Sequence, residues 1–139
     1  MGFLSQAPLQ LDELIAEVAG SGRGGIVTFL GTVRDHHGGR TVSALAYSAY
    51  EPMAESVCAD IVAEAEQKWP VKLALKHRLG DLAIGDGAVA IAVAGDHRDE
   101  AFAACRYAIE ELKRRVPIWK RETFTDGAVE WVGAEGTTV

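Results

Sequence analysis

Five of the fourteen Lys and Arg residues of this chain lie in one short segment, residues 112–122, although the net charge is −6. Pro117 divides the segment, so Lys113 falls at the end of a predicted helix and Lys120 in a predicted strand. Two lysines on elements joined by a tight turn can face one space, where they can grip an anion or transfer protons. Cationic side chains are also common in the last turn of a helix, because they complement its dipole. Charge alone therefore favours a capped helix end over a reactive site.

Other cationic side chains lie at the ends of predicted elements. Arg34 ends a predicted strand, and ends of strands are places where sites are often built. His97 and Arg98 begin a predicted helix, where free backbone N–H groups favour anions. Neighbouring cations disfavour the charged form of a lysine, which can then act as a base or nucleophile at neutral pH. A lysine that stays charged stabilises negative charge that develops during a reaction.

Other kinds of chemistry have less support. The neighbouring His36 and His37 have no third ligand at a recognisable spacing, so we expect solvated loop side chains and no metal site. The glycine-rich residues 20–25 precede a strand, whereas a phosphate-binding loop follows a strand and opens a helix. No acidic pair suits glycoside chemistry, and no Ser or Cys has the context of a nucleophile.

The overall composition sets the class of protein. A chain of 139 residues with 48% hydrophobic and 24% charged residues is typical of one globular domain. Its acidic balance argues against nucleic-acid binding, and no apolar run reaches the roughly 18 residues of a membrane helix. We interpret Cys58 and Cys105 as core residues in a reducing compartment. Without a recognisable signal peptide, we expect a cytoplasmic protein.

The hydrophobic pattern predicts which elements position the cations. We expect an α+β fold with helices packed on a mixed, largely antiparallel sheet, and a loose tail over residues 133–139. The strand before Arg34 should pair with the next strand through the loop between them, and Asp96 should cap the last helix. Helices are predicted at 9–19, 53–69 and up to 116, and strands at 26–34, 41–48, 71–79, 88–94, 118–124 and 129–132.

Several of these segments together resemble the large, catalytic subunit of molybdopterin synthase. The resemblance runs in one order from about Leu11 to Val132, and the Pro-x-Trp-Lys-Arg-Glu run is its most specific part. The segments that carry it are residues 25–34, 77–82, 96–98 with 101–102, 112–113, 117–122 and 131–132.

This resemblance implies an activity and partners. The family installs two sulfurs in cyclic pyranopterin monophosphate to form the dithiolene of molybdopterin, in molybdenum cofactor biosynthesis. A small ubiquitin-like subunit whose C-terminal Gly-Gly carries a thiocarboxylate supplies the sulfur, so no resident cofactor is expected. The family assembles as a heterotetramer with a homodimer of large subunits at its centre. The implied fold is of the α/β-hammerhead type.

The resemblance also implies roles for individual residues. The catalytic lysines of the family fall on Lys113 and Lys120. Its pterin- and phosphate-binding residues fall on Arg34, His97 and Arg98, partly across the dimer interface.

For three further residues, a role in the site and a purely structural role are both open. Arg121, which we group with the substrate-binding residues, and the apolar Phe29 and Met53 are weaker candidates for the site. A structural role stays an equal alternative for each, because apolar strand and helix residues usually belong to the core.

A second function class stays open from the residues alone. The same cations could belong to a non-catalytic module that binds an anionic metabolite or the C-terminal tail of a protein. Such a module would bind ligands without transferring sulfur.

Overall fold

A computed structural model of the chain describes residues 2–133. The loose tail predicted over residues 133–139 therefore lies outside the described residues, except for Gly133. The helices are α1 (Leu11–Val18), α2 (Glu51–Lys68) and α3 (Arg98–Arg115). The strands are β1 (Leu4–Ser5), β2 (Gly25–Thr32), β3 (His36–His37), β4 (Arg40–Ala49), β5 (Val71–Arg78), β6 (Gly80–Leu82), β7 (Gly87–Gly95), β8 (Ile118–Phe124) and β9 (Val129–Val132).

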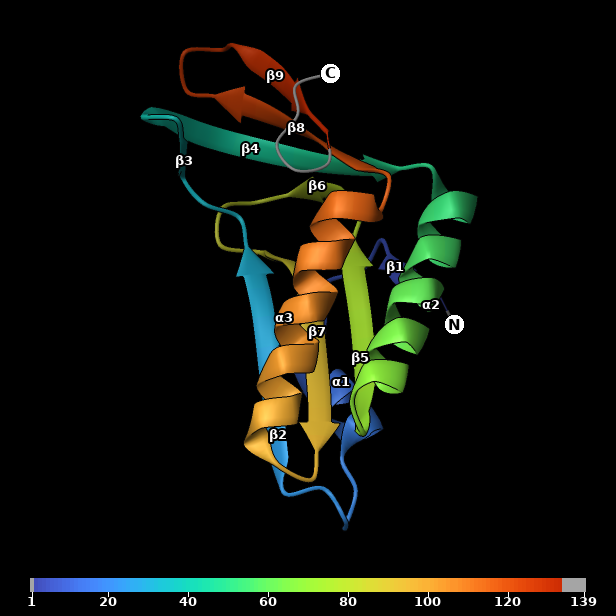
Figure 1. Cartoon of the computed structure of the whole chain (residues 1–139). Coiled ribbons are helices and arrows are strands. Elements are labelled where there is room, and N and C mark those ends of the chain that lie inside the picture. The colour runs from blue at the N-terminus through green and yellow to red at the C-terminus, as the bar shows by residue number, and fades with distance from the viewer. Residues whose placement is uncertain (1, 134–139) are drawn as a thin grey trace.

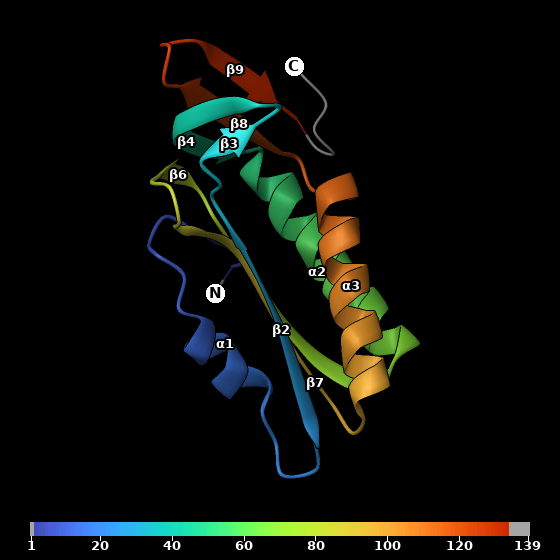
Figure 2. The same cartoon turned by 90° about the vertical axis from the view of Figure 1, so that its left-hand side faces the viewer.

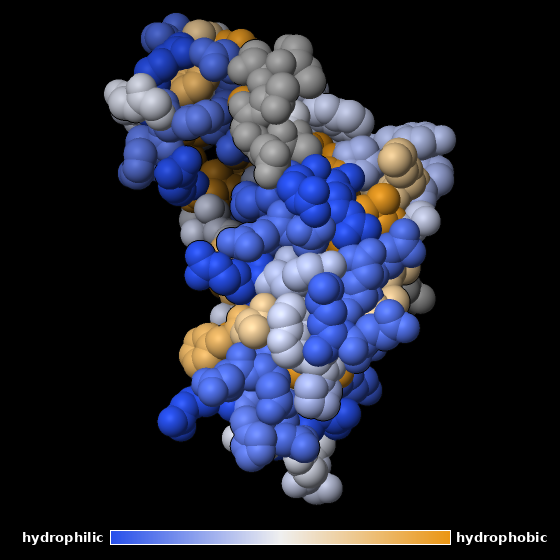
Figure 3. Space-filling view, viewed as in Figure 1, coloured by the Kyte–Doolittle hydropathy of each residue, from blue (hydrophilic) through white to orange (hydrophobic). Residues whose placement is uncertain are grey.

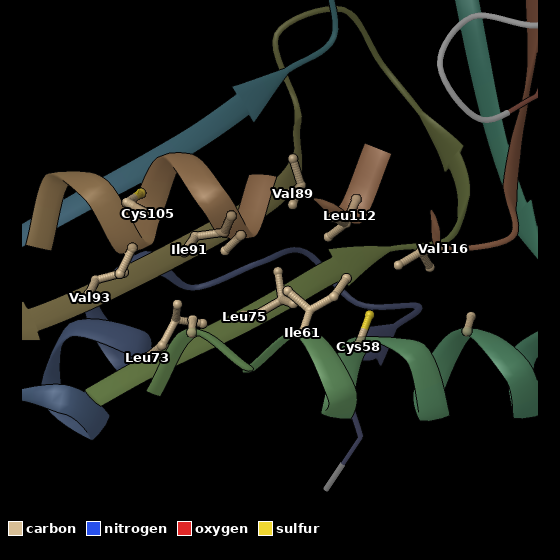
Figure 4. Close-up of a cluster of buried hydrophobic side chains, with 14 of the residues drawn as sticks. Cys58, Ile61, Leu73, Leu75, Val89, Ile91, Val93, Cys105, Leu112 and Val116 are labelled. Atoms are coloured by element: carbon tan, nitrogen blue, oxygen red, sulfur yellow. The ribbon is translucent and has the colours of Figure 1, made fainter. Parts of the chain in front are cut away.

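The first sheet has the strand order β1-β5-β7-β2, and β7 lies inside it. Strand β7 is apolar on both sides, which suits a strand covered on both faces. Val89, Ile91 and Val93 face α2 and α3, where they form the main core (Figure 4). The opposite face of β7 presents only alanines, so α1 can approach closely with Leu14 and Val18 (Figure 2).

The second sheet has the order β3-β4-β8-β9, with β6 paired to β4, and it lies across one end of the first sheet (Figure 1). All its pairs are antiparallel, and the parallel pair of the described residues joins β1 to β5. Pro117 connects the end of α3 directly to β8, so the end of this helix meets the second sheet. The predicted α+β class and largely antiparallel pairing are confirmed.

Two expectations about the elements are wrong. Strand β2 does not pair with β4; it pairs along its whole length with β7, while β4 pairs with β8. In this position Val27 and Phe29 of β2 pack against the main core, and residues 33–35 carry the chain over to the second sheet. Helix α3 begins one residue later than expected, with His97 at the N-cap and no side-chain cap from Asp96.

Candidate active site

A pocket of about 740 Å³ lies where the end of α3 meets the two sheets. Helix α3 contributes Leu112 and Lys113 to its lining, and β8 contributes Ile118 and Lys120. The end of the first sheet closes another side with Phe29. The pocket therefore depends on the corner between α3 and β8.

The chain around Pro117 places both lysines at this pocket. At the end of helix α3, the fully buried Val116 donates its backbone N–H to the carbonyl oxygen of Leu112 at 3.0 Å. After Pro117, the strand alternation of β8 turns Ile118 and Lys120 to the same side. The prediction that Lys113 and Lys120 face one space is confirmed, whereas their catalytic roles stay predictions.

The electrostatics of the pocket act most clearly on Lys113. Loss of water around its amine lowers the pKa of Lys113, and the positive charges of Lys120 and Arg34 lower it further. Arg34 lies just beyond β2 and is exposed, yet it is close enough to contribute to this effect. A lysine with a lowered pKa has a larger neutral fraction, as a base or nucleophile requires.

A neutral histidine forms part of the pocket wall. Burial lowers the pKa of His77 to about 4, and the charge of Lys113 lowers it as well. His77 Nδ1 lies 2.8 Å from the backbone O of Arg78, which fixes the proton on that nitrogen. Its ring packs edge-on against Tyr47, with 4.8 Å between the ring centroids. His77 is therefore a buried histidine whose hydrogen bond is satisfied.

Glu122 is a site residue that the sequence does not point to. Its side chain is buried at 3% exposure, and its Oε2 lies 3.8 Å from Lys120 Nζ. The other oxygen, Oε1, contacts His37 Nδ1, so the expectation of a freely solvated His37 is wrong. His36 stays exposed beside Asp35, as predicted. The nearest sequence signal for Glu122 is that it shares a strand face with Lys120.

Gly31 brings the backbone of β2 close to the pocket. A Cβ at this position would lie 2.8 Å from Val89 Cγ1, which is too close for any side chain. The register of β2 against β7 shifts between Gly31 and Thr32. Both features are typical of a glycine inside a strand, which often marks a bulge or a close approach of the backbone to a neighbour.

The other predicted binding residues do not converge on the pocket within one chain. His97 and Arg98 are exposed at the start of α3, roughly 22 Å along the helix from Lys113. Arg121 points away from the pocket, 3.7 Å from Asp81 and over the ring of Trp131.

Phe29 and Met53, the two apolar candidates, differ in their position relative to the pocket. Phe29 lines the pocket, whereas Met53 lies half-exposed on α2 and does not line it. Within residues 2–133, no three His, Cys, Asp or Glu side chains gather closely enough to hold a metal ion. None of the three helices described is long and apolar enough to cross a membrane.

Comparison with known proteins decides the family. The family model described as MoaE protein matches residues 4–115. The chain belongs to the MoaE family. The predicted resemblance to molybdopterin synthase catalytic subunits is thereby confirmed.

Individual members of the MoaE family agree with this assignment. The molybdopterin synthase catalytic subunit 1 of Mycobacterium tuberculosis is 49% identical over 131 residues, covering 94% of this chain and 88% of that protein. The molybdopterin synthase catalytic subunit of Bacillus subtilis is 44% identical, covering 94% of this chain and 83% of that protein. The crystal structure of molybdopterin synthase from Staphylococcus aureus superimposes with a TM-score of 0.90 at 39% identity, covering 95% of this chain and 96% of that one.

Proposed function

We propose that this chain is the catalytic subunit of a molybdopterin synthase and converts cyclic pyranopterin monophosphate to molybdopterin at the pocket of Lys113 and Lys120. The observation that carries the proposal is the convergence of these two lysines, from different elements, on one pocket. Membership of the MoaE family supplies the reaction that such a pocket serves.

The two lysines have different surroundings, which supports different roles. The pKa of Lys113 is lowered by desolvation and by neighbouring cations, so Lys113 is suited to assist attack of the sulfur nucleophile or loss of the leaving group. Lys120 is paired with the buried carboxylate of Glu122 and supplies a fixed positive charge. Such a charge stabilises negative charge on the reacting atoms.

The pocket also suits the C-terminal tail of a small sulfur-carrying subunit. Apolar side chains such as Phe29 and Val132 line it beside the lysines, and Gly31 and Gly133 leave room for an incoming backbone. A tail that ends in Gly-Gly is narrow, and its terminal thiocarboxylate is an anion that the lysines attract. The sulfur then comes from the partner, and the reaction needs no resident cofactor.

An unpaired edge of the first sheet supports a homodimer. Strand β2 ends the order β1-β5-β7-β2, and it carries the exposed side chains of Ile26 and Leu30. Beside it, Phe102 of α3 is 60% exposed over a groove of about 590 Å³, and Figure 3 shows apolar atoms at the surface there. Ile26 and Leu30 share the face of the sheet that α1 covers, whereas Phe102 lies on the α3 face, so apolar side chains flank the open strand edge on both sides. Such an edge is suited to association with a second copy.

A two-fold axis across β2 completes the site with residues of the second copy. The backbone of Arg98 lies beside Gly25, because a Cβ on this glycine would be 3.7 Å from Arg98 Cα. A two-fold axis exchanges the two ends of β2, which are about 23 Å apart. In each chain, Arg98 lies beside the start of β2, and the pocket of Lys113 lies beside its end. The axis therefore brings the start of β2 of the second copy, with its Arg98 and His97, next to the pocket of the first. They can then hold the phosphate of the pterin, together with Arg34.

Reconstitution tests the proposed function. The purified chain, the thiocarboxylated small subunit and cyclic pyranopterin monophosphate are combined, and dithiolene product is measured. Product formation that requires all three components is expected. Binding of the pterin or of the tail without product would instead identify a non-catalytic binding module.

The cysteines support a location for the reaction. Both are buried free thiols, in keeping with a reducing compartment, and we place the reaction in the cytoplasm.

A further inference from the structure

A line of polar contacts joins the protein surface to Lys120. His37 lies on β3, with 38% of its side chain exposed, and its Nδ1 contacts Oε1 of the buried Glu122. The second oxygen of Glu122 lies 3.8 Å from Lys120 Nζ. One carboxylate therefore has two cationic or potentially cationic partners, one facing solvent and one facing the pocket.

The other charged groups around Glu122 are already paired or neutral. Burial and the negative charge of Glu122 raise the pKa of Tyr47, which keeps this phenol neutral. Glu130, opposite Glu122 on β9, binds Arg40. Arg40 also contacts Asp126 and stacks on Phe124. The groups that contact Glu122 directly are therefore His37 and Lys120, and of these two the imidazole is the one that can change charge in the physiological range.

The neighbouring histidine has different contacts. His36 Nδ1 lies 2.9 Å from the carboxylate of Asp35, and its side chain is exposed. His36 thus provides a matched control on the same short strand.

We propose that His37 is a positioning residue that sets, through Glu122, how strongly Lys120 is held at the pocket. An imidazole is the kind of side chain that can gain or lose a charge in the physiological pH range, so its hold on a neighbouring carboxylate can change there. When His37 is protonated, it shares the Glu122 carboxylate with Lys120 and weakens the hold on the lysine. When His37 is neutral, Glu122 holds Lys120 more strongly. This inference rests on the proposed function for its effect on turnover.

The kinetic test uses His37→Gln in the reconstituted complex with the thiocarboxylated small subunit. Glutamine keeps a hydrogen-bond donor for Glu122 but cannot change charge. We expect the ratio of kcat between wild type and variant to change about tenfold between about pH 5.5 and 8, with KM for the pterin unchanged. His36→Gln should reproduce the wild-type profile. A ratio for His37→Gln that stays constant with pH would overturn the proposal.

A second measurement does not depend on turnover. The imidazole of His37 is titrated by NMR in the wild-type chain and in Lys120→Ala. Without Lys120, His37 is the remaining cationic partner of Glu122, and a competing positive charge is gone. The pKa of His37 should therefore shift upwards, while that of His36 stays unchanged. An unchanged His37 titration would contradict the coupling. If the wild-type complex makes no product, the proposed function fails, and this titration still decides the coupling.

Discussion

Lys113 owes its altered chemistry to its position at the end of α3. The amine has lost part of its hydration, and Lys120 and Arg34 add positive charge nearby. Each of these causes disfavours the charged ammonium, so all three lower the pKa of Lys113. The order of the effects is desolvation first, then Lys120, then Arg34.

Removing the neighbouring charge should therefore reverse part of this shift. We expect Lys120→Ala to raise the pKa of Lys113, because a like charge that opposed protonation is gone. Arg34→Ala should raise it less. NMR titration of isotopically methylated lysines measures the change, and Lys72→Ala, at the far end of β5 from the pocket, is the control. A Lys113 titration that is the same in Lys120→Ala and wild type would contradict the electrostatic coupling.

At the scale of residues, the sequence predicts the lysines better than their partners. Pro117 and the helical and strand periodicities on its two sides are local, and they are enough to orient Lys113 and Lys120. For Glu122 the local signal is weak: it shares a strand face with Lys120, but a glutamate in a strand ordinarily faces solvent. Its partner His37 is 85 positions away in the sequence. Only the folded chain brings these two residues together.

Helices α2 and α3 are joined by a set of polar contacts near the pocket end of α3. Glu64 of α2 accepts two hydrogen bonds from the guanidinium of Arg115, at 2.7 and 3.0 Å. The hydroxyl of Tyr107 donates a third, at 2.6 Å. The hydrogen bonds from Arg115 and then from Tyr107 lower the pKa of Glu64 to about 2.

This contact predicts a pH dependence of stability. A carboxylate whose pKa is lower in the folded state stabilises that state above its unfolded pKa and loses the contribution as the pH falls through the folded value. We expect Glu64→Gln to lower the free energy of unfolding at pH 7, and the difference from wild type to fade between about pH 4.5 and 2. Urea unfolding at pH 7 and pH 2.5 measures it, with Glu17→Gln on α1 as control. A difference that is equal at both pH values would show that the ion pair does not contribute.

At the scale of elements, the sequence predicts type more reliably than pairing. The long helices and the strands β8 and β9 are found where their periodicity places them. The pairing of β2 with β4 was expected because the two strands follow each other. The apolar strand β7 instead takes β2 as its neighbour, and this competition between distant strands has no local signature. The short strands β1 and β6 are missed for the same reason, since each exists only through its pairing partner.

At the scale of the whole molecule, one chain presents an incomplete set of anion-binding residues. Lys113 and Lys120 lie at one end of α3, and His97 and Arg98 lie at the other. The homodimer proposed above would make each site from two chains. Variants with lesions in different halves of the site should then complement each other.

Mixing two inactive variants tests this arrangement. In a mixed dimer of Lys113→Ala and Arg98→Ala, one site carries both lesions and the other carries none. Random exchange of chains should restore about one quarter of wild-type molybdopterin formation. Mixing Lys113→Ala with Lys120→Ala should restore nothing, because both lesions affect the same half-site. A mixture of the first pair that is no more active than its components would contradict the shared site.

The central claim is that sulfur transfer takes place at the pocket of Lys113 and Lys120. The rate of molybdopterin formation by Lys113→Ala tests it most directly. The variant is assayed with thiocarboxylated small subunit and cyclic pyranopterin monophosphate, beside Lys72→Ala. We expect a loss on the order of 10²–10³-fold in rate with both ligands still bound, because a group that acts on the transition state is removed. Lys72→Ala should match wild type. Turnover by Lys113→Ala close to that of wild type would contradict a catalytic role for this lysine.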